Sequence, residues 1–599
     1  MKSPATIRRP YCRPLLYVGL IACTLLLLPL QSLHAQSAPT RPPRDSAKVV
    51  TGNRGVVVAE TQLASDIGCQ ILAKGGNAVD AAVGVAFALQ VSWPEAGNIG
   101  GGGFMMIAPP EEEVVCVNYR EKAPAAVDPF SFADWKQHRH ARMAGVPGTV
   151  RGLALAHETY GSLPWREVIA PSIALARDGL VVDPHLAFSL NSVLRLKSVR
   201  TESRFDEFRR VYGHPDQRPW QAGDRLLQPD LAQTLTSIAL QGPAAFYEGE
   251  IAKKIVTEMK RSDGLITAQD LQGYQPQLLP AVAGDVGPYT VYGAPPPASG
   301  GTIVLLQLRM IEALRFSADK NGPYWTGDQV HLLVEAMRRG FRERAAWLGD
   351  PNYVAIPPHL LTPEHARRLA SSIDVDKATS SEEIAGSIPL SEGPYESAET
   401  THFSVVDTNG LAVSNTYTLE GTFGCRIVVP GAGFVLNNEM GDFNWYPGYT
   451  DRNGKIGTTP NQLAPGKRML SSQSPTIVRE NGKLKLVVGS PGGRTIINTV
   501  TEILAQTLLL DRPLETAISG PRFHHQWFPD EIRFETDDQG VFTAMQEELT
   551  AKGHRIAERE ADWRQGSAHG IVVDLPSGEA TGVADWRRGG GASSVASKP

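Results

Sequence analysis

Hydrophobic residues before Thr400 recur mostly at helical spacing. Small apolar residues from Ala64 to Val91 follow this spacing on both sides of Gly75-Gly76, which predicts two helices with a break at the glycines. Helical spacing also predicts helices over residues 151–159, 165–177, 300–316 and 328–347. Residues 289–292 read as a strand. The last of these helices is rich in arginine, which predicts a solvated face with salt bridges.

After Thr400 the pattern changes to strands. Residues 401–407 and 411–419 flank Thr408-Asn409-Gly410, which predicts a β-hairpin. Strands are also predicted over residues 426–429, 433–437, 483–489 and 570–575, and a helix over residues 494–510. Residues 444–468 are irregular and rich in proline and glycine, and a loop of this length is often a lid over an active site.

The first 35 residues read as a signal peptide. Basic residues precede an apolar run over residues 15–30, and Leu33-His34-Ala35 precedes the expected cut. This predicts export to the periplasm or the extracellular space, without a permanent membrane span. Leu20-Ile21-Ala22-Cys23 also resembles a lipoprotein acylation box, so lipidation of Cys23 stays open as a minor alternative.

Composition excludes several classes of protein. Hydrophobic residues make up 42% of the 599 residues and charged residues 20%, which predicts a globular chain. The net charge of −5 gives no basic footprint for nucleic acid. Beyond the leader, Cys69, Cys116 and Cys425 are too few for a disulfide framework and predict small buried residues. His524-His525 lacks the third ligand that a metal site requires, so we expect no metal. We also expect no cofactor.

Thr400 is the strongest candidate for a catalytic residue. It opens a strand directly after a polar run, and a cut between Glu399 and Thr400 would expose an α-amine beside the Thr400 hydroxyl. An α-amine titrates near pH ~7.7–8.0 and can serve as the base for its own side chain. The alternative is an ordinary strand after a surface loop. In the middle of three plausible hairpin registers Thr418 lies opposite Thr400, which also fits a common Thr–Thr pair.

Other motifs could bind a substrate. Gly492 and Gly493 lie between a predicted strand and a predicted helix, where their N–H groups could form an oxyanion hole. A phosphate site there would lack the lysine of a P-loop. Arg120 could hold a carboxylate, with the adjacent hydroxyls of Ser471 and Ser472 nearby. Glu439 and Asp442 could hold an ammonium group, so the set would suit an α-amino acid, although each residue alone is more often structural.

The chain closely resembles the γ-glutamyltranspeptidases, which are N-terminal-nucleophile hydrolases. The resemblance covers residues 49–583, and its motifs lie at residues 97–105, 118–124, 146–152, 295–301, 400–407, 416–423, 437–443, 470–476 and 489–495. It implies the α+β class, with a four-layer αββα sandwich built from two chains of one cleaved precursor. These would be a large subunit of residues 36–399 and a small subunit of residues 400–599, forming a heterodimer.

The resemblance also implies residue roles. Thr400 would be the nucleophile for both self-cleavage and catalysis, with Thr418 as the supporting hydroxyl and Gly492 and Gly493 as the oxyanion hole. The α-carboxylate of the donor would contact Arg120, Ser471 and Ser472, and its α-amine would contact Glu439 and Asp442. Residues 444–468 match the lid.

One position departs from the family, since many members have asparagine where this chain has Glu420. Its charge would attract the α-amine of the donor and repel the α-carboxylate.

The predicted activity is γ-glutamyl transfer and glutathione hydrolysis. The γ-glutamyl group would pass through a threonine ester to water, an amino acid or a peptide. The nearest rival is an acylase of the same fold acting on glutaryl-type amides such as cephalosporin side chains. A secreted binding protein without catalysis is the rival from another class, and it predicts an uncut chain.

Overall fold

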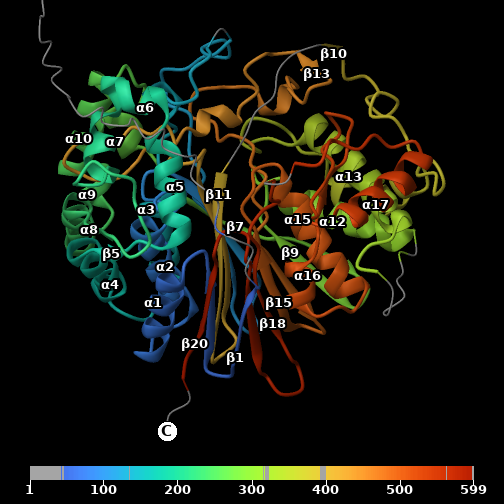
Figure 1. Cartoon of the computed structure of the whole chain (residues 1–599), viewed down its shortest axis with the longest axis horizontal. Helices are drawn as coiled ribbons and strands as arrows, with labels where there is room; N and C mark the ends of the chain where they lie inside the picture. Colours follow the sequence, from blue (N-terminus) through green and yellow to red (C-terminus); the bar gives the residue numbers. More distant parts are fainter. Residues whose placement is uncertain are drawn as a thin grey trace, which may run out of the picture. The chain divides into compact units, whose positions relative to one another are not determined.

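The computed structural model describes residues 42, 46–133, 135–314, 316, 323–391, 399–560 and 563–596 (Figure 1). These residues belong to one compact unit, Thr40–Pro599. The predicted signal peptide over residues 1–35 and the alternative at Cys23 lie outside the described residues. None of the described helices combines the length and apolar character that a membrane span requires.

One seven-stranded sheet carries the predicted nucleophile. All its neighbouring strands are antiparallel. Its order is β20 (Gly591–Ser594), β2 (Gly55–Ala59), β11 (Glu399–Asp407), β12 (Ala412–Glu420), β3 (Gly102–Ala108), β4 (Val115–Asn118) and β7 (Gln277–Pro280). Strands from before and after Thr400 therefore pair directly.

A second seven-stranded sheet is also antiparallel throughout. Its order is β1 (Lys48–Gly52), β19 (Ala580–Ala584), β18 (His569–Val573), β15 (Lys483–Gly489), β14 (Thr476–Glu480), β9 (Tyr289–Gly293) and β8 (Val282–Val286). Three two-stranded ribbons complete the strands: β5 (Leu180–Val181) with β6 (Arg225–Leu226), β10 (Leu390–Ser391) with β13 (Thr450–Asp451), and β16 (Phe523–His524) with β17 (Arg533–Phe534).

Alternation along the strands explains the packing. Val56 and Val58 belong to an apolar cluster that also contains Ile477 and Val487 of the second sheet. Val57, between them, belongs to a different cluster with helices α1 (Gln62–Ala73) and α2 (Ala78–Ser92). Successive side chains of a strand point to opposite faces, so one face of this sheet meets the other sheet and the opposite face meets helices.

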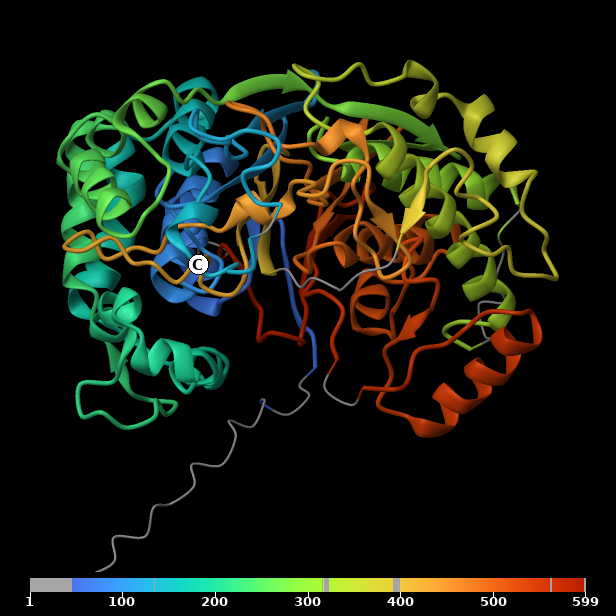
Figure 2. The ribbon, with the colours of Figure 1, turned by 90° about the horizontal axis from the view of Figure 1, so that it is seen from above.

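Helices also pack on the second sheet. Val478, Leu486 and Val488 share a buried cluster with residues of α12 (Gly300–Ala313), α13 (Gly327–Trp347), α15 (Thr495–Leu504) and α16 (Leu514–Ser519). Figures 1 and 2 show helical groups on opposite sides of the strands. The other helices are α3 (Thr149–Tyr160), α4 (Trp165–Asp178), α5 (Pro184–Leu194), α6 (Lys197–Thr201), α7 (Asp206–Tyr212), α8 (Pro229–Gln241), α9 (Ala244–Tyr247), α10 (Glu250–Arg261), α11 (Ala268–Gln272), α14 (Pro363–Ala370) and α17 (Gln539–Ala551). The predicted α+β class is confirmed.

Local sequence accounts for most of these elements. The predicted break at Gly75-Gly76 separates α1 from α2, and Asn77 starts α2 with a capping box to Asp80. Cys69, Cys116 and Cys425 are free and buried, as predicted. Strands were wrongly predicted over residues 426–429 and 433–437, where a single bridge joins Val428 and Val435. Gly431 and Gly433 between them have positive φ angles of 67° and 73°, so the chain turns there.

The arginine-rich face of α13 was also misread as solvated. Arg338 and Arg339 are each only 3% exposed, and both form ion pairs with Glu335 on the same helix. Arg339 also donates to the carbonyl of Ser372 at 2.7 Å. Helical spacing identifies such a face, but it does not reveal that a loop will cover the face and supply hydrogen-bond acceptors.

Candidate active site

Thr400 lies at the start of β11, where the hairpin pairing is irregular. The pairs Thr401–Tyr417 and His402–Thr416 correspond to the middle of the three predicted registers. The register then shifts between Glu399 and Thr401, so that Thr400 opposes two residues of β12, Thr418 and Leu419, and the extra residue of this bulge lies on β12. Bulges redirect a side chain and are common beside active sites. Thr400 is 4% exposed and lies in the wall of a cavity of about 710 Å³.

Thr418 is the hydroxyl neighbour of Thr400. Thr400 Oγ1 lies 3.3 Å from Thr418 Oγ1, which also accepts a hydrogen bond from the backbone N–H of Glu420 at 2.8 Å. Glu420 has a φ angle of 74°, an uncommon backbone conformation for a residue other than glycine. The end of β12 therefore turns so that its backbone orients the Thr418 hydroxyl. On the other side, Arg588 Nη1 donates to the Thr400 carbonyl at 3.4 Å.

Gly492 and Gly493 lie in the loop between β15 and α15, as predicted, and border the same cavity. Their φ angles are 130° and 58°, which side-chain-bearing residues rarely adopt. A Cβ on Gly492 would lie 2.5 Å from Thr495 Oγ1. The loop thus turns tightly and presents its backbone, rather than side chains, at the positive end of a helix. This arrangement can stabilise an oxyanion.

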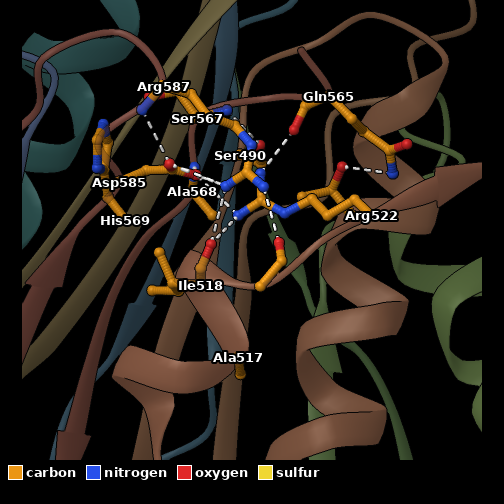
Figure 3. A network of polar contacts seen from close by, with 12 residues as sticks. Ser490, Ala517, Ile518, Arg522, Gln565, Ser567, Ala568, His569, Asp585 and Arg587 are labelled. Atoms are coloured by element: carbon orange, nitrogen blue, oxygen red, sulfur yellow. Dashed lines mark hydrogen bonds and ion pairs between the residues drawn. The ribbon is translucent and has the colours of Figure 1, made fainter. Parts of the chain in front are cut away.

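A network of buried polar side chains contacts this loop at Ser490 (Figure 3). Ser490 Oγ accepts from the N–H of Ser567 at 3.2 Å, and Ser567 Oγ donates to Glu60 at 2.9 Å. Residues 565–568 are held in turn by an ion pair of 2.7 Å between Arg522 and Asp585. Sequence reasoning missed this network, because its members are far apart in the chain and none carries a recognisable motif.

Arg522 and Asp585 also form hydrogen bonds with the backbone of residues 565–568. Arg522 Nη1 donates to the carbonyl of Gln565 at 2.6 Å, and Asp585 accepts from the N–H of Ala568 at 2.8 Å. Burial disfavours the Asp585 charge, but Arg522 and Arg587 outweigh it and lower the pKa of Asp585 to about 2. Asp585 is therefore a permanent anion around which the supporting segment is fixed.

The predicted donor residues form a cluster around Arg120. Its guanidinium lies 2.6 Å from Glu439 and 3.3 Å from Glu121, and it also binds Asp442. Burial raises the pKa of Glu121 to about 7, and burial likewise raises that of Glu439 well above its usual range. Three carboxyl groups thus share one buried cation, and an additional ammonium group would be favourable here.

Ser471 and Ser472 also line the cavity, with a partner that sequence reasoning missed. Arg344, on α13, donates to Ser472 Oγ at 3.1 Å and to Ser299 Oγ at 2.9 Å. Burial lowers the pKa of Arg344 to about 9, and the neighbouring cations Arg494 and Arg120 lower it further. Since Arg344 donates to Ser472 Oγ, the hydrogen of that hydroxyl is available to donate to a carboxylate.

All ten residues predicted for catalysis or substrate binding border this one cavity: Thr400, Thr418, Gly492, Gly493, Arg120, Glu420, Glu439, Asp442, Ser471 and Ser472. Glu420 accepts a hydrogen bond from Asn438, and its charge is one of those that raise the pKa of Glu439. The Glu420 carboxylate therefore acts within the donor cluster. Glu399, the residue before the predicted cut, pairs with Glu420 in the sheet.

Residues of the predicted lid segment border the cavity. Tyr446, Gly454, Lys455 and Asn461 are among its residues at the cavity wall. Arg494, next to the glycine loop, donates to the carbonyl of Gly454 at 2.7 Å. One arginine thereby connects residues 444–468 to the loop that presents Gly492 and Gly493.

Two groups of described residues have the spacing to hold a metal ion. They are His331 with Glu335 and His554, and Glu343 with His359 and His365. Neither group borders the cavity. His524, which does border it, is instead hydrogen-bonded to Asn498 at 2.8 Å and to Gln526 at 2.9 Å.

Comparisons with known proteins identify the family. Residues 64–595 match the gamma-glutamyltranspeptidase family. The glutathione hydrolase proenzyme of Escherichia coli is 39% identical over 94% of this chain and 96% of its own length. A Helicobacter pylori gamma-glutamyltranspeptidase structure has a TM-score of 0.52 and 32% identity, covering 59% of this chain and 100% of that one. A cephalosporin acylase from Bacillus halodurans shares the fold, with a TM-score of 0.80 and 24% identity over 94% of this chain and 100% of that one. This chain belongs to the γ-glutamyltranspeptidase family.

Proposed function

We propose that Thr400 is the nucleophile for the γ-glutamyl transfer and glutathione hydrolysis that this family performs. The chain is a γ-glutamyltransferase and glutathione hydrolase, a member of a family whose bacterial relatives are named proenzymes. The observation that carries the assignment of Thr400 is its hydroxyl, 3.3 Å from that of Thr418 in the cavity that Gly492 and Gly493 also border.

The proposed activation is a cut between Glu399 and Thr400. Thr400 Oγ attacks the Glu399 carbonyl, and hydrolysis of the resulting ester leaves a large subunit ending at Glu399 and a small subunit starting at Thr400. Both subunits would contribute to a four-layer αββα sandwich. The two sheets and their separate helical clusters support this description. We further propose removal of residues 1–35 and export to the periplasm or the extracellular space.

In the mature enzyme the freed α-amine accepts the proton of Thr400 Oγ. The oxygen attacks the γ-carbonyl of the donor, and the N–H groups of Gly492 and Gly493 stabilise the tetrahedral oxyanion. Loss of one such donor costs roughly 3–4 kcal/mol in comparable sites. The C–N bond then breaks, the leaving amine takes the proton, and water or an acceptor amine releases the γ-glutamyl group from the ester.

Donor recognition would use both ends of the amino acid. Arg120, Ser471 and Ser472 would bind the α-carboxylate, while Glu439 and Asp442 would bind the α-amine. Glu420 adds a further negative charge on the side of the amine. Glu420, Glu439 and Asp442 at the cavity wall favour a γ-glutamyl group, which carries an ammonium, over a glutaryl group, which does not.

A denaturing gel tests the activation step. Purified wild-type protein should give two bands, and the smaller fragment should begin at Thr400 on N-terminal sequencing. Thr400→Ala should remain a single uncut chain without activity, whereas Thr401→Ala should still be cut. A fully active intact chain, or a fragment that starts elsewhere, contradicts the proposal.

Turnover of paired anilides tests the donor. The enzyme should hydrolyse γ-glutamyl p-nitroanilide far faster than glutaryl p-nitroanilide. Replacement of Glu420 by Gln should reduce this preference by weakening ammonium binding. A glutaryl preference in the wild-type enzyme would favour the acylase alternative.

A further inference from the structure

The glycine loop between β15 and α15 carries two hydroxyl groups that the proposed mechanism does not use. They belong to Ser490, directly before Pro491, and to Thr495, the first residue of α15. The two glycines between them have positive φ angles and no side chain to hold them, so their peptide units could rotate easily without a partner. A rotation of either unit would turn its N–H group away from the cavity.

Ser490 contacts the peptide unit that joins Pro491 to Gly492. Its hydroxyl donates to the Pro491 carbonyl at 2.8 Å, and among the described residues no other group donates to this carbonyl. The peptide bond is trans, so its carbonyl and its N–H point in opposite directions. The hydrogen bond that holds the Pro491 carbonyl therefore also holds the direction of the Gly492 N–H.

The segment around Ser567 fixes Ser490 itself (Figure 3). The Ser490 side chain is fully buried, and its oxygen accepts from the N–H of Ser567 at 3.2 Å. Gly566 packs so closely that a Cβ there would lie 2.4 Å from Ser490 Oγ and 2.9 Å from the Pro491 oxygen. Because the oxygen of the Ser490 hydroxyl accepts one hydrogen bond and its hydrogen forms the other, the hydroxyl has a single direction.

Thr495 contacts the next peptide unit, which joins Gly492 to Gly493. Its Oγ1 donates to the Gly492 carbonyl at 2.8 Å, and its backbone N–H donates to the same oxygen at 3.2 Å. By the same geometry, these two hydrogen bonds hold the direction of the Gly493 N–H. Thr495 supplies two donors where Ser490 supplies one, so the second unit stays partly held without the Thr495 hydroxyl.

The N–H groups of the two glycines remain available to a ligand. Neither the Gly492 nor the Gly493 N–H donates to another group within the part of the chain that the structure describes. Both glycines border the cavity together with Thr400. Donors that already point at the reacting oxygen stabilise a transition state more than donors that must first rotate into place.

We propose that Ser490 and Thr495 are positioning residues of the oxyanion hole. Each hydroxyl holds one peptide unit so that its N–H is directed at the oxyanion before the substrate binds, and each acts through the backbone rather than on the reacting atoms. This inference rests on the proposed function, to which it adds the residues that direct the two oxyanion donors.

Steady-state kinetics with γ-glutamyl p-nitroanilide test the inference. Ser490→Ala should lower kcat about ten- to a hundredfold and change KM by less than about twofold, because the oxyanion forms only after the donor has bound. Thr495→Val should lower kcat by a smaller factor of about three to ten, since the Thr495 N–H remains. Thr495→Ser keeps the hydroxyl and should restore most of the rate.

Matched hydroxyl groups outside the loop provide controls. Ser414 is also fully buried, accepts from the N–H of Thr476 at 3.1 Å and donates to the carbonyl of Val488 at 3.1 Å. Thr507 donates to the carbonyl of Ile503 at 2.8 Å. Ser414→Ala and Thr507→Val remove the same kinds of hydrogen bond, and each should keep kcat within about twofold of the wild-type value.

Inhibitor binding separates positioning from a general loss of folded protein. An analogue of glutamate with a boronic acid in place of the γ-carboxyl group forms a tetrahedral adduct with a hydroxyl nucleophile, whereas L-glutamate binds without one. In Ser490→Ala the inhibition constant of the boronic acid should rise at least about tenfold, and that of L-glutamate should change less than about twofold. Inhibition constants do not depend on the fraction of active protein, so a merely structural role would leave both unchanged.

The outcomes distinguish the two levels of proposal. If the wild-type enzyme does not hydrolyse γ-glutamyl p-nitroanilide, the proposed function is wrong. If it does, but Ser490→Ala and Thr495→Val retain the kcat and the boronic acid affinity of the control variants, the proposed function stands and the positioning role is wrong. If Ser490→Ala is not cut into two chains, the comparison of Thr495→Val with Thr495→Ser decides by the same criteria.

Discussion

Gly489 and His402 are in contact across the space between the two sheets, so that a Cβ on Gly489 would lie 2.3 Å from His402 Cε1. The imidazole cannot move aside easily, because its nitrogens lie 2.8 Å from Thr416 Oγ1 and 3.1 Å from Ser404 Oγ. His402 follows Thr400 by two residues, and Gly489 ends the strand before the glycine loop. This contact fixes the distance between nucleophile and loop.

Substitution of Gly489 should therefore reduce both stability and catalysis. Gly489→Ala should lower the free energy of unfolding by about 1–3 kcal/mol, because overpacking displaces β15 from β11. It should reduce kcat more than it raises KM, since the oxyanion donors move with β15. Thermal unfolding and steady-state kinetics measure the two effects. Gly540→Ala, where an added Cβ would meet only Asp538 at 3.2 Å, is the matched control and should be nearly neutral.

The hydroxyl group of Thr418 should contribute more to catalysis than the volume of its side chain. Thr418→Val keeps the volume but removes the partner of Thr400, and it should reduce kcat for γ-glutamyl p-nitroanilide about tenfold or more, the loss expected for one hydrogen bond to a reacting group. Thr418→Ser should retain most of the activity. Equal rates in the valine variant and the wild-type enzyme would show that Thr418 has no catalytic role.

Stability should depend on pH through Glu121. Its pKa is raised to about 7 in the folded protein, against a usual value of 4.5. The folded state therefore binds more protons than the unfolded state between these values, and stability falls as pH rises from 4.5 to 7. Glu121→Gln should remove this contribution.

The measurement for Glu121 is the difference in melting temperature between wild-type protein and Glu121→Gln at several pH values. The wild-type protein should lose stability relative to the variant as pH rises through this window. A difference that is constant with pH would contradict the assignment. Glu312→Gln, at a residue with no place in the cluster, provides the baseline.

Breaking the buried ion pair between Arg522 and Asp585 should lower the stability of the protein strongly. Asp585→Asn leaves Arg522 and Arg587 without their shared anion and should lower the free energy of unfolding by about 3–5 kcal/mol. Denaturant titration measures the loss. Asp178→Asn, which breaks the exposed pair with Arg177, should leave the free energy of unfolding almost unchanged. Similar effects of the two variants would show that the buried pair has no special structural role.

Local sequence was sufficient for the catalytic hairpin, because Asn409-Gly410 fixes the turn and the turn fixes the register of Thr401 and Tyr417. It was also sufficient for the loop at Gly492, which lies between a strand and a helix as predicted. It was not sufficient to predict the contact of Arg344 with Ser472 or the hydrogen bond between Ser490 and Ser567. A long side chain can reach a cavity from a helix whose pattern looks like a surface, and partners more than 70 residues apart in sequence leave no local signal.

The pairing of β11 has a consequence for the fate of the precursor. This strand begins at the proposed cut, yet it lies between β2, from the earlier part of the chain, and β12, from the later part. Similar junctions join β20 to β2 and β12 to β3. Scission at Glu399 would therefore yield fragments that remain interleaved through backbone ladders. Neither could exchange with fragments from another molecule without unfolding, so each active molecule would be assembled from a single translation product.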